Sequence, residues 1–440
     1  MTAPAPVLAR RLGLLDAVFI GLGSMIGAGV FAVWAPAAQA AGPLLLVGLA
    51  IALVVAFCNA TSSAQLAAQY PTSGGTYVYG RERLGAWPGF IAGWGFVVGK
   101  TAAIAAMALT FGAYVFGPLA PWIAVVIVLL LTGVNLLGVT RTARLTRIIV
   151  SVVLVVLAAG VVANLLGGPR DFAPDQPAIP VQGGIYGLLQ SAGLLFFAFA
   201  GYARIATMGE EVKNPKRVIP LAILWALLLT AGVYAAVGAV LLWRFPPEIL
   251  AVTEAPLASA AAYSPWEWLT PIVAAAAALA TVGAMLNLMT GVGRTTLAMA
   301  RNNDLPRWLS RVDRTYGVPR NAELVLAAVV CGLVLLTDVR VVIGFSSFGV
   351  LVYYLIANLA AFTQQRADRR YPRFLQILGA FACCALVVTL PWQALGLGVA
   401  VYFVGVVYRL IRRPDRAPAR ALVDTDLPEA DEPKPRRAAD

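Results

Sequence analysis

The sequence predicts an all-helical protein that crosses a membrane about twelve times. Apolar runs of roughly 17 to 25 residues, each long enough to span a hydrocarbon core, recur along the chain. The chain is 60% hydrophobic and only 12% charged, about half the charge of an ordinary soluble domain. Its basic residues also gather in alternate segments between the apolar runs.

These runs predict twelve spans, and each boundary is defined only to within several residues. They cover 14–36, 43–66, 88–116, 122–139, 146–166, 186–209, 218–242, 269–298, 323–338, 341–363, 374–391 and 392–411. Because little more than Asp338 to Arg340 separates the ninth span from the tenth, eleven or thirteen spans also fit the pattern.

The distribution of Lys and Arg predicts the orientation. With both termini in the cytoplasm, the inner segments hold 27 of the 33 basic residues and the outer loops hold 3. This excess is what membrane insertion requires of cytoplasmic loops. Basic cytoplasmic loops that serve membrane insertion and face anionic lipid explain the net charge of +12. No nucleic-acid partner is therefore expected.

Composition also excludes several kinds of site. The chain has no histidine, so metal sites that use imidazole and proton relays that use histidine are absent. Its four cysteines lack CxxC spacing and indicate small core residues. We therefore expect no metal, no cofactor and no enzyme activity.

Glycines crowd the first span in the stretch GLGSMIGAGVF, from Gly21 to Phe31. One interpretation is close helix packing, because Gly23 and Gly27 form a GxxxG motif. The other is a broken helix, in which glycine lets backbone groups approach a ligand.

A second interruption is expected in the sixth span, where Gly201 lies among small residues. Breaks in spans one and six are what two inverted five-helix repeats require. We expect an N-terminal cytoplasmic tail (1–13), a first repeat (14–166), a second repeat (186–363), two further helices (374–411) and a disordered cytoplasmic tail (412–440).

Three motifs carry a resemblance to a known family. They are GSMIGAGVF at 23–31, FFAFAGY followed by GEEVKNPKRVIP at 196–220, and GRTTLAMARNNDLP at 293–306. In this order and spacing, the chain resembles amino acid permeases of the amino acid–polyamine–organocation superfamily. The resemblance implies the leucine-transporter type of fold, alternating access and a location in the cytoplasmic membrane.

The resemblance also implies a binding site for an amino acid at the two breaks. The substrate carboxylate would meet backbone N–H groups from Ser24 to Gly29, and the amino group would meet carbonyls near Ile20 to Gly23 and Phe197 to Ala200. Phe197 and Phe199 would wall or gate the pocket, or simply pack between helices. The predicted substrate-binding residues are Ile20, Gly23, Ser24, Met25, Ile26, Gly27, Ala28, Gly29, Phe197, Ala198, Phe199, Ala200 and Gly201.

Basic residues inside spans are costly and indicate function by default. Lys100 is a candidate for proton coupling or for the place of a sodium ion; the alternative is an ammonium that caps carbonyls at a helix break. Relatives that use such a lysine carry it on the fifth span, where this chain has Val153. Arg204 is expected to pair with Glu211 as a gate, to meet substrate, or to reach the interface. Arg294 is interpreted as structural or gating.

No acidic residue is expected to be buried in a span, which disfavours a cationic substrate and favours a neutral amino acid. Proton coupling, exchange and sodium coupling stay open, as does the oligomeric state. The alternatives are a cationic amino acid transporter and a membrane sensor that binds amino acids without moving them. A channel is less favoured because no filter-like loop is apparent.

Overall fold

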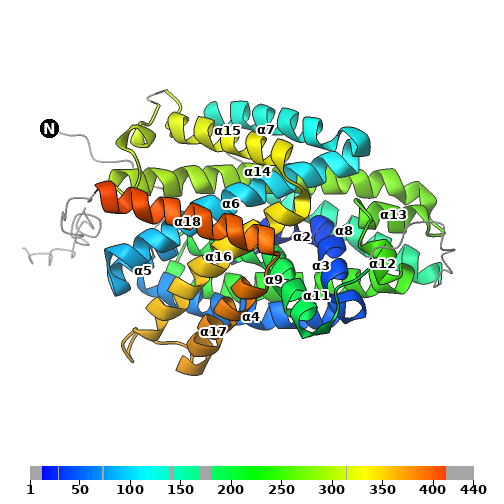
Figure 1. Cartoon of the computed structure of the whole chain (residues 1–440), viewed down its shortest axis with the longest axis horizontal. Helices are drawn as coiled ribbons and strands as arrows, with labels where there is room; N and C mark the ends of the chain where they lie inside the picture. Colours follow the sequence, from blue (N-terminus) through cyan, green and yellow to red (C-terminus); the bar gives the residue numbers. More distant parts are fainter. Residues whose placement is uncertain are drawn as a thin grey trace, which may run out of the picture.

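Long apolar helices packed side by side make up most of the protein in the computed structural model (Figure 1). The structure describes residues 12–27, 29–71, 74–138, 143–168, 180–209, 211–313 and 315–412. Within these residues, Leu12 and Val212 form an isolated β-bridge, which connects the first described residue to the loop after the sixth span.

The first five predicted spans coincide with helices. Span one is divided into α1 (Leu14–Ile26), α2 (Gly29–Ala32) and α3 (Trp34–Ala41). Spans two to five are α4 (Leu45–Gln69), α6 (Ala86–Phe116), α7 (Ala120–Leu136) and α8 (Ala143–Leu166), with the short α5 (Thr76–Leu84) before α6.

The remaining seven spans also coincide with helices. Span six comprises α9 (Gly184–Phe199), the 3-10 turn η3 (Ala200–Tyr202) and α10 (Ala203–Ala206). Spans seven to twelve are α11 (Pro215–Arg244), α14 (Thr270–Arg301), α15 (Arg320–Leu336), α16 (Val339–Phe362), α17 (Arg373–Thr389) and α18 (Trp392–Arg412). Between α11 and α14 lie the short α12 (Pro247–Leu250) and α13 (Pro256–Ala262).

By length and composition, 9 stretches of the described residues are long and apolar enough to cross a membrane. Two of them, Trp34–Gln69 and Ala86–Leu136, each hold two helices separated by a 3-10 turn. These turns, η1 (Gly42–Leu44) and η2 (Gly117–Leu119), have the same sequence, Gly-Pro-Leu. Proline suits the start of a helix because its missing N–H would be unpaired there. The predicted class, an all-helical membrane protein, is confirmed.

Helix contacts follow the pattern of two interlocked repeats. α1 packs on α11 and α8, while α9 packs on α4 and α16. Exchanging α1 with α9, α4 with α11 and α8 with α16 converts the first set of contacts into the second. Exchanging α6 with α14 as well converts the packing of α6 on α16 into that of α14 on α8. The repeat boundaries, 14–166 and 186–363, stay a prediction.

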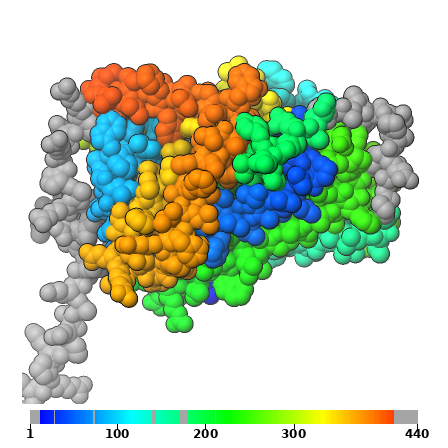
Figure 2. All heavy atoms as spheres, turned by 60° about the horizontal axis from the view of Figure 1, so that its bottom comes forward, coloured from blue at the N-terminus to red at the C-terminus, as the bar shows by residue number. Residues whose placement is uncertain are grey.

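The last two helices lie outside this core. α17 packs on α4, α9 and α16, and α18 packs mainly on α16 (Figures 1 and 2). Large apolar side chains on the outer surface, such as Leu336 and Ile411, are 85% and 77% exposed. So much outward apolar surface is suited to lipid rather than to water.

Two details of the sequence prediction are wrong. Glu323 is buried at 1% exposure in the first turn of α15, because the helix turns it toward α14, where Gly293 leaves room for its carboxyl group. Cys384 is exposed, because its neighbour Cys383 takes the inward position on α17. Of the predicted tails, 1–11 and 413–440 lie outside the described residues.

Candidate functional site: a cavity at two helix interruptions

The first interruption lies between α1 and α2. α1 ends at Ile26, Gly27 follows in a turn and α2 begins at Gly29; Ala28 lies outside the described residues. A β-carbon at Gly29 would approach the β-carbon of Ala198 to 2.6 Å. Glycine therefore serves close helix packing here as well as the interruption.

The second interruption tightens the helix into a 3-10 turn instead of unwinding it. α9 ends at Phe199, and η3 leads directly into α10. Gly201, at the centre of η3, packs on the first interrupted helix so closely that a β-carbon would lie 2.6 Å from the backbone nitrogen of Met25. The two interrupted helices therefore cross in backbone contact.

A cavity of about 470 Å³ adjoins this crossing. Near the interruptions its wall includes the apolar side chains of Met107, Phe197 and Ala284, and its other end reaches α5 and the last turns of α14. The described residues that line it are Ser24, Met25, Gly29, Gly74, Tyr77, Val78, Phe96, Lys100, Ala103, Met107, Phe197, Ala200, Gly201, Ala203, Arg204, Thr207, Ala284, Asn287, Leu288, Gly291, Arg294, Thr295, Leu297, Ala298, Arg301 and Asn302.

Carbonyl groups of the interruptions already have hydrogen-bond donors from the protein. The Lys100 ammonium, 6% exposed, donates to the carbonyl of Ala200 at 3.1 Å. The Tyr234 hydroxyl of α11 lies 2.7 Å from the Met25 carbonyl and 3.2 Å from that of Ala198. Among the described residues, no carboxylate lies within ion-pair distance of Lys100.

The structure separates the predicted site residues into two groups. Those that line the cavity are Ser24, Met25, Gly29, Lys100, Phe197, Ala200, Gly201, Arg204 and Arg294. Those that do not are Ile20, Gly23, Ile26, Gly27, Ala198, Phe199 and Glu211.

Local geometry explains the second group. α1 stays helical through Ile26, so the carbonyls of Ile20 to Gly23 lie inside a helix, away from the break. The Ile20 carbonyl accepts the Ser24 hydroxyl at 2.9 Å. Phe199 packs on the ring of Tyr234, with centroids 5.1 Å apart, and so forms no wall of the pocket.

Two arginines of the cavity converge on one carboxylate. Glu211 lies 3.1 Å from Arg294 and 3.9 Å from Arg204, which brings the predicted Arg204–Glu211 pair together. Arg204 also donates to the Thr207 hydroxyl at 3.2 Å. Counting Lys100 and Arg301, the lining carries four cationic side chains, and its described residues include no Asp or Glu.

Several residues of the site were missed by sequence reasoning. Tyr234, Asn287 and Arg301 are examples, and only Tyr234 carried a sequence clue. A tyrosine hydroxyl in the middle of an apolar span needs a hydrogen-bond partner. The identity of that partner follows only from the fold.

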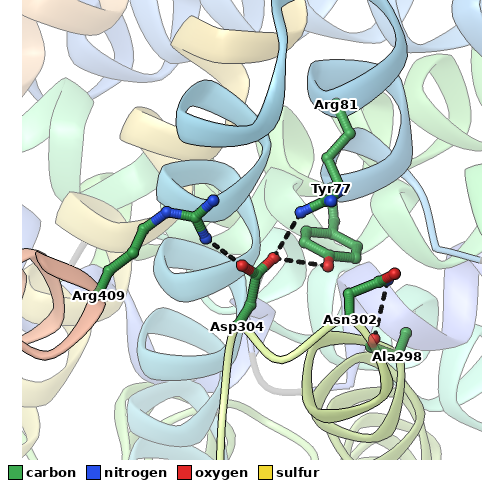
Figure 3. Close-up of polar contacts among 6 residues, drawn as sticks. All are labelled: Tyr77, Arg81, Ala298, Asn302, Asp304 and Arg409. Carbon is green, nitrogen blue, oxygen red and sulfur yellow. Dashed lines mark hydrogen bonds and ion pairs between the residues drawn. The ribbon is translucent and has the colours of Figure 1, made fainter. Parts of the chain in front are cut away.

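The far end of the cavity is backed by a buried ionic cluster around Asp304 (Figure 3). The Asp304 carboxylate accepts hydrogen bonds from the Tyr77 hydroxyl and from Arg81, each at 2.8 Å, and also pairs with Arg409. Burial, and next the negative charge of Asp304, raise the pKa of Tyr77, so the phenol stays protonated and donates.

Comparison with known proteins identifies the family of this chain. The model of the amino acid permease family matches residues 12–409. An uncharacterized transporter of Mycobacterium tuberculosis is 55% identical over 406 residues, which cover 92% of each chain. A branched-chain amino acid permease of Bacillus subtilis is 26% identical (90% of this chain, 93% of the relative). A chloroplastic cationic amino acid transporter of Arabidopsis thaliana is 28% identical (90% and 73%).

The family model, at residues 12–409, covers both interruptions and, apart from the last three residues of α18, every described helix. With this match, the predicted leucine-transporter type of fold follows for the whole bundle. The chain belongs to the amino acid permease family of membrane transporters.

Proposed function

We propose that this protein moves amino acids with uncharged side chains across the cytoplasmic membrane by alternating access, with both termini in the cytoplasm. The substrate would occupy the part of the cavity next to the two helix interruptions. The observation that carries this proposal is one cavity that contacts both interruptions and is lined by cations without a described carboxylate.

The ends of the substrate need opposite partners, because an unpaired charge is costly to desolvate. Backbone N–H groups near Gly29 would receive the carboxylate, and carbonyls near Ala200 would receive the ammonium. Lys100 already donates to the Ala200 carbonyl. The substrate ammonium must therefore share this acceptor with Lys100 or displace it, which links binding to the state of the lysine.

The preference for the side chain of the substrate follows from the other residues that line the cavity. Phe96, Met107 and Phe197 offer apolar contacts. Arg204 and Arg294 share the single carboxylate of Glu211, so this pair of arginines keeps a net positive charge that repels a cationic side chain. The relatives include a branched-chain permease and a cationic amino acid transporter. The basic lining favours the first type of substrate over the second.

The cavity also supports a conformational assignment. Its far end is formed by α5 and the end of α14, which belong to the basic segments assigned to the cytoplasm. We infer that this conformation is open to the cytoplasm and that Lys100 couples transport to protons or to exchange.

Uptake into proteoliposomes tests the proposal. Labelled leucine, alanine, glutamate and lysine would be compared with and without an inward proton gradient, and with and without unlabelled amino acid inside. We expect uptake of a neutral amino acid and little of lysine. Preferential lysine uptake would favour the cationic class, and binding without any uptake would favour a sensor. Liposomes without the protein serve as the inactive control.

A further inference from the structure

Asp304 is held in a defined place just beyond the end of α14. Its backbone N–H donates to the Met299 carbonyl at 2.8 Å, and the preceding Asn303 adopts a left-handed conformation with φ 60°. The side chain is fully buried. These features aim the carboxylate between α5 and α18 (Figure 3).

The last helix reaches this carboxylate through Arg409. The Arg409 side chain is 4% exposed and pairs with the second oxygen of Asp304. Its guanidinium also lies 4.7 Å from the ring centroid of Phe90 and 5.0 Å from that of Trp87. One arginine thus connects α18 to the start of α6 and to the loop after α14.

The cluster lies directly behind the wall of the cavity. Tyr77 belongs both to the cluster and to the cavity lining, as Figure 3 shows for its position beside Asp304 and Asn302. Asn302 lines the cavity and donates to the Ala298 carbonyl at 3.1 Å. Movement of Asp304 would therefore move the wall.

Stability alone is a weak explanation for this cluster. The carboxylate of Asp304 and the guanidinium of Arg409 are buried together, with the partly buried Arg81 beside them. Burying charges costs more than packing apolar side chains of similar size. The described part of α18 otherwise contacts mainly α16, α6 and α17. Through this cluster, a helix outside the two repeats reaches the end of the cavity that α5 and the last turns of α14 form, which we call its mouth.

We propose that Asp304 and Arg409 are positioning residues that hold Tyr77 and α5 in the open mouth of the cavity, so that α18 sets how readily the mouth closes. This rests on the proposed alternating access. Losing the Arg409 contact would free the mouth wall and shift the population toward the closed conformation.

Thiol labelling in inside-out vesicles tests this without any substrate. A cysteine is placed in the lining (Ala298→Cys) in a background without the two less buried native thiols (Cys331→Ala, Cys384→Ala). We expect Arg409→Met to slow its labelling by a membrane-impermeant reagent by about five-fold or more, with Arg409→Lys in between. Arg412→Met is the control, because Arg412 is on the same helix and contacts the ring of Tyr408.

Labelling of a folded Arg409→Met variant at the parent rate would overturn the proposal. Equal slowing by Arg412→Met would overturn it as well. If Arg409→Met fails to fold, Tyr77→Phe decides, since it keeps both ion pairs and removes only the hydroxyl; unchanged labelling then rejects the proposal. Absence of transport in the wild type would reject the proposed function and leave the labelling result valid.

Discussion

The ammonium of Lys100 donates a hydrogen bond to the carbonyl of Ala200, 100 positions away in the chain, at 3.1 Å. A lysine at the middle of a membrane-spanning helix thereby meets the interrupted turn of another. The contact is the one expected of an ammonium that caps a carbonyl at a helix break. Proton coupling by Lys100, or its standing in the place of sodium, stays a prediction. The same contact puts Lys100 at the proposed ammonium position of the substrate.

Replacing Lys100 separates these roles. Lys100→Met keeps the apolar stem and removes the charge, so we expect the response of uptake to a proton gradient to disappear. The measurement is initial uptake into proteoliposomes with and without the gradient. Thr101→Val is the matched control, because Thr101 bonds only within its own helix in the described structure. A variant that keeps the full gradient response would show that Lys100 is a structural charge.

Gly201→Ala should disrupt the crossing of the interrupted helices. The added methyl group meets the backbone of Ser24 and Met25, which cannot move aside as a flexible side chain can. We expect destabilisation of about 1–3 kcal/mol and loss of transport, measured by thermal unfolding in detergent and by uptake. Gly232→Ala has open space around its β-carbon and should behave like the wild type. Normal uptake by Gly201→Ala would refute the close crossing.

Tyr234→Phe should weaken the connection between α11 and both interruptions. The ring keeps its packing on Phe199 and Trp34, while the Met25 and Ala198 carbonyls lose their shared hydroxyl. An unsatisfied buried acceptor costs about 1–3 kcal/mol. The expected result is a lower unfolding temperature together with a raised KM. Tyr186→Phe, at an exposed tyrosine, provides the comparison, and identical behaviour of the two variants would argue against the bridge.

Arg204→Gln should relax discrimination against cationic substrates. It removes one like charge from the cavity, so the ratio of the inhibition constants for lysine and leucine should fall by about ten-fold, or about 1.4 kcal/mol. Competition against labelled leucine uptake measures this ratio. Arg307→Gln, at an arginine that does not line the cavity and is bonded to Asn303, should leave the ratio unchanged. An unchanged ratio in Arg204→Gln would show that Arg204 does not contribute to the specificity.

The sequence by itself determined the all-helical membrane class, the approximate places of the spans and the segments in which both interruptions lie, while the exact number of spans stayed open. The reason is that a bilayer imposes a one-dimensional constraint: each crossing needs a long apolar run, and basic loops report the side. The glycines at 27 and 29 and at 201 could likewise be recognised, because few residues permit such close backbone approach.

Only the tertiary structure decided what meets at those positions. Periodicity says which face of a helix is buried but not which helix covers it. It therefore could not foresee that Tyr234 lies between the two interruptions, that Glu323 faces α14, or that Asp304 joins Tyr77 to Arg409. These contacts connect residues separated by long stretches of chain, and their partners follow from the packing of helices against each other, which no local pattern encodes.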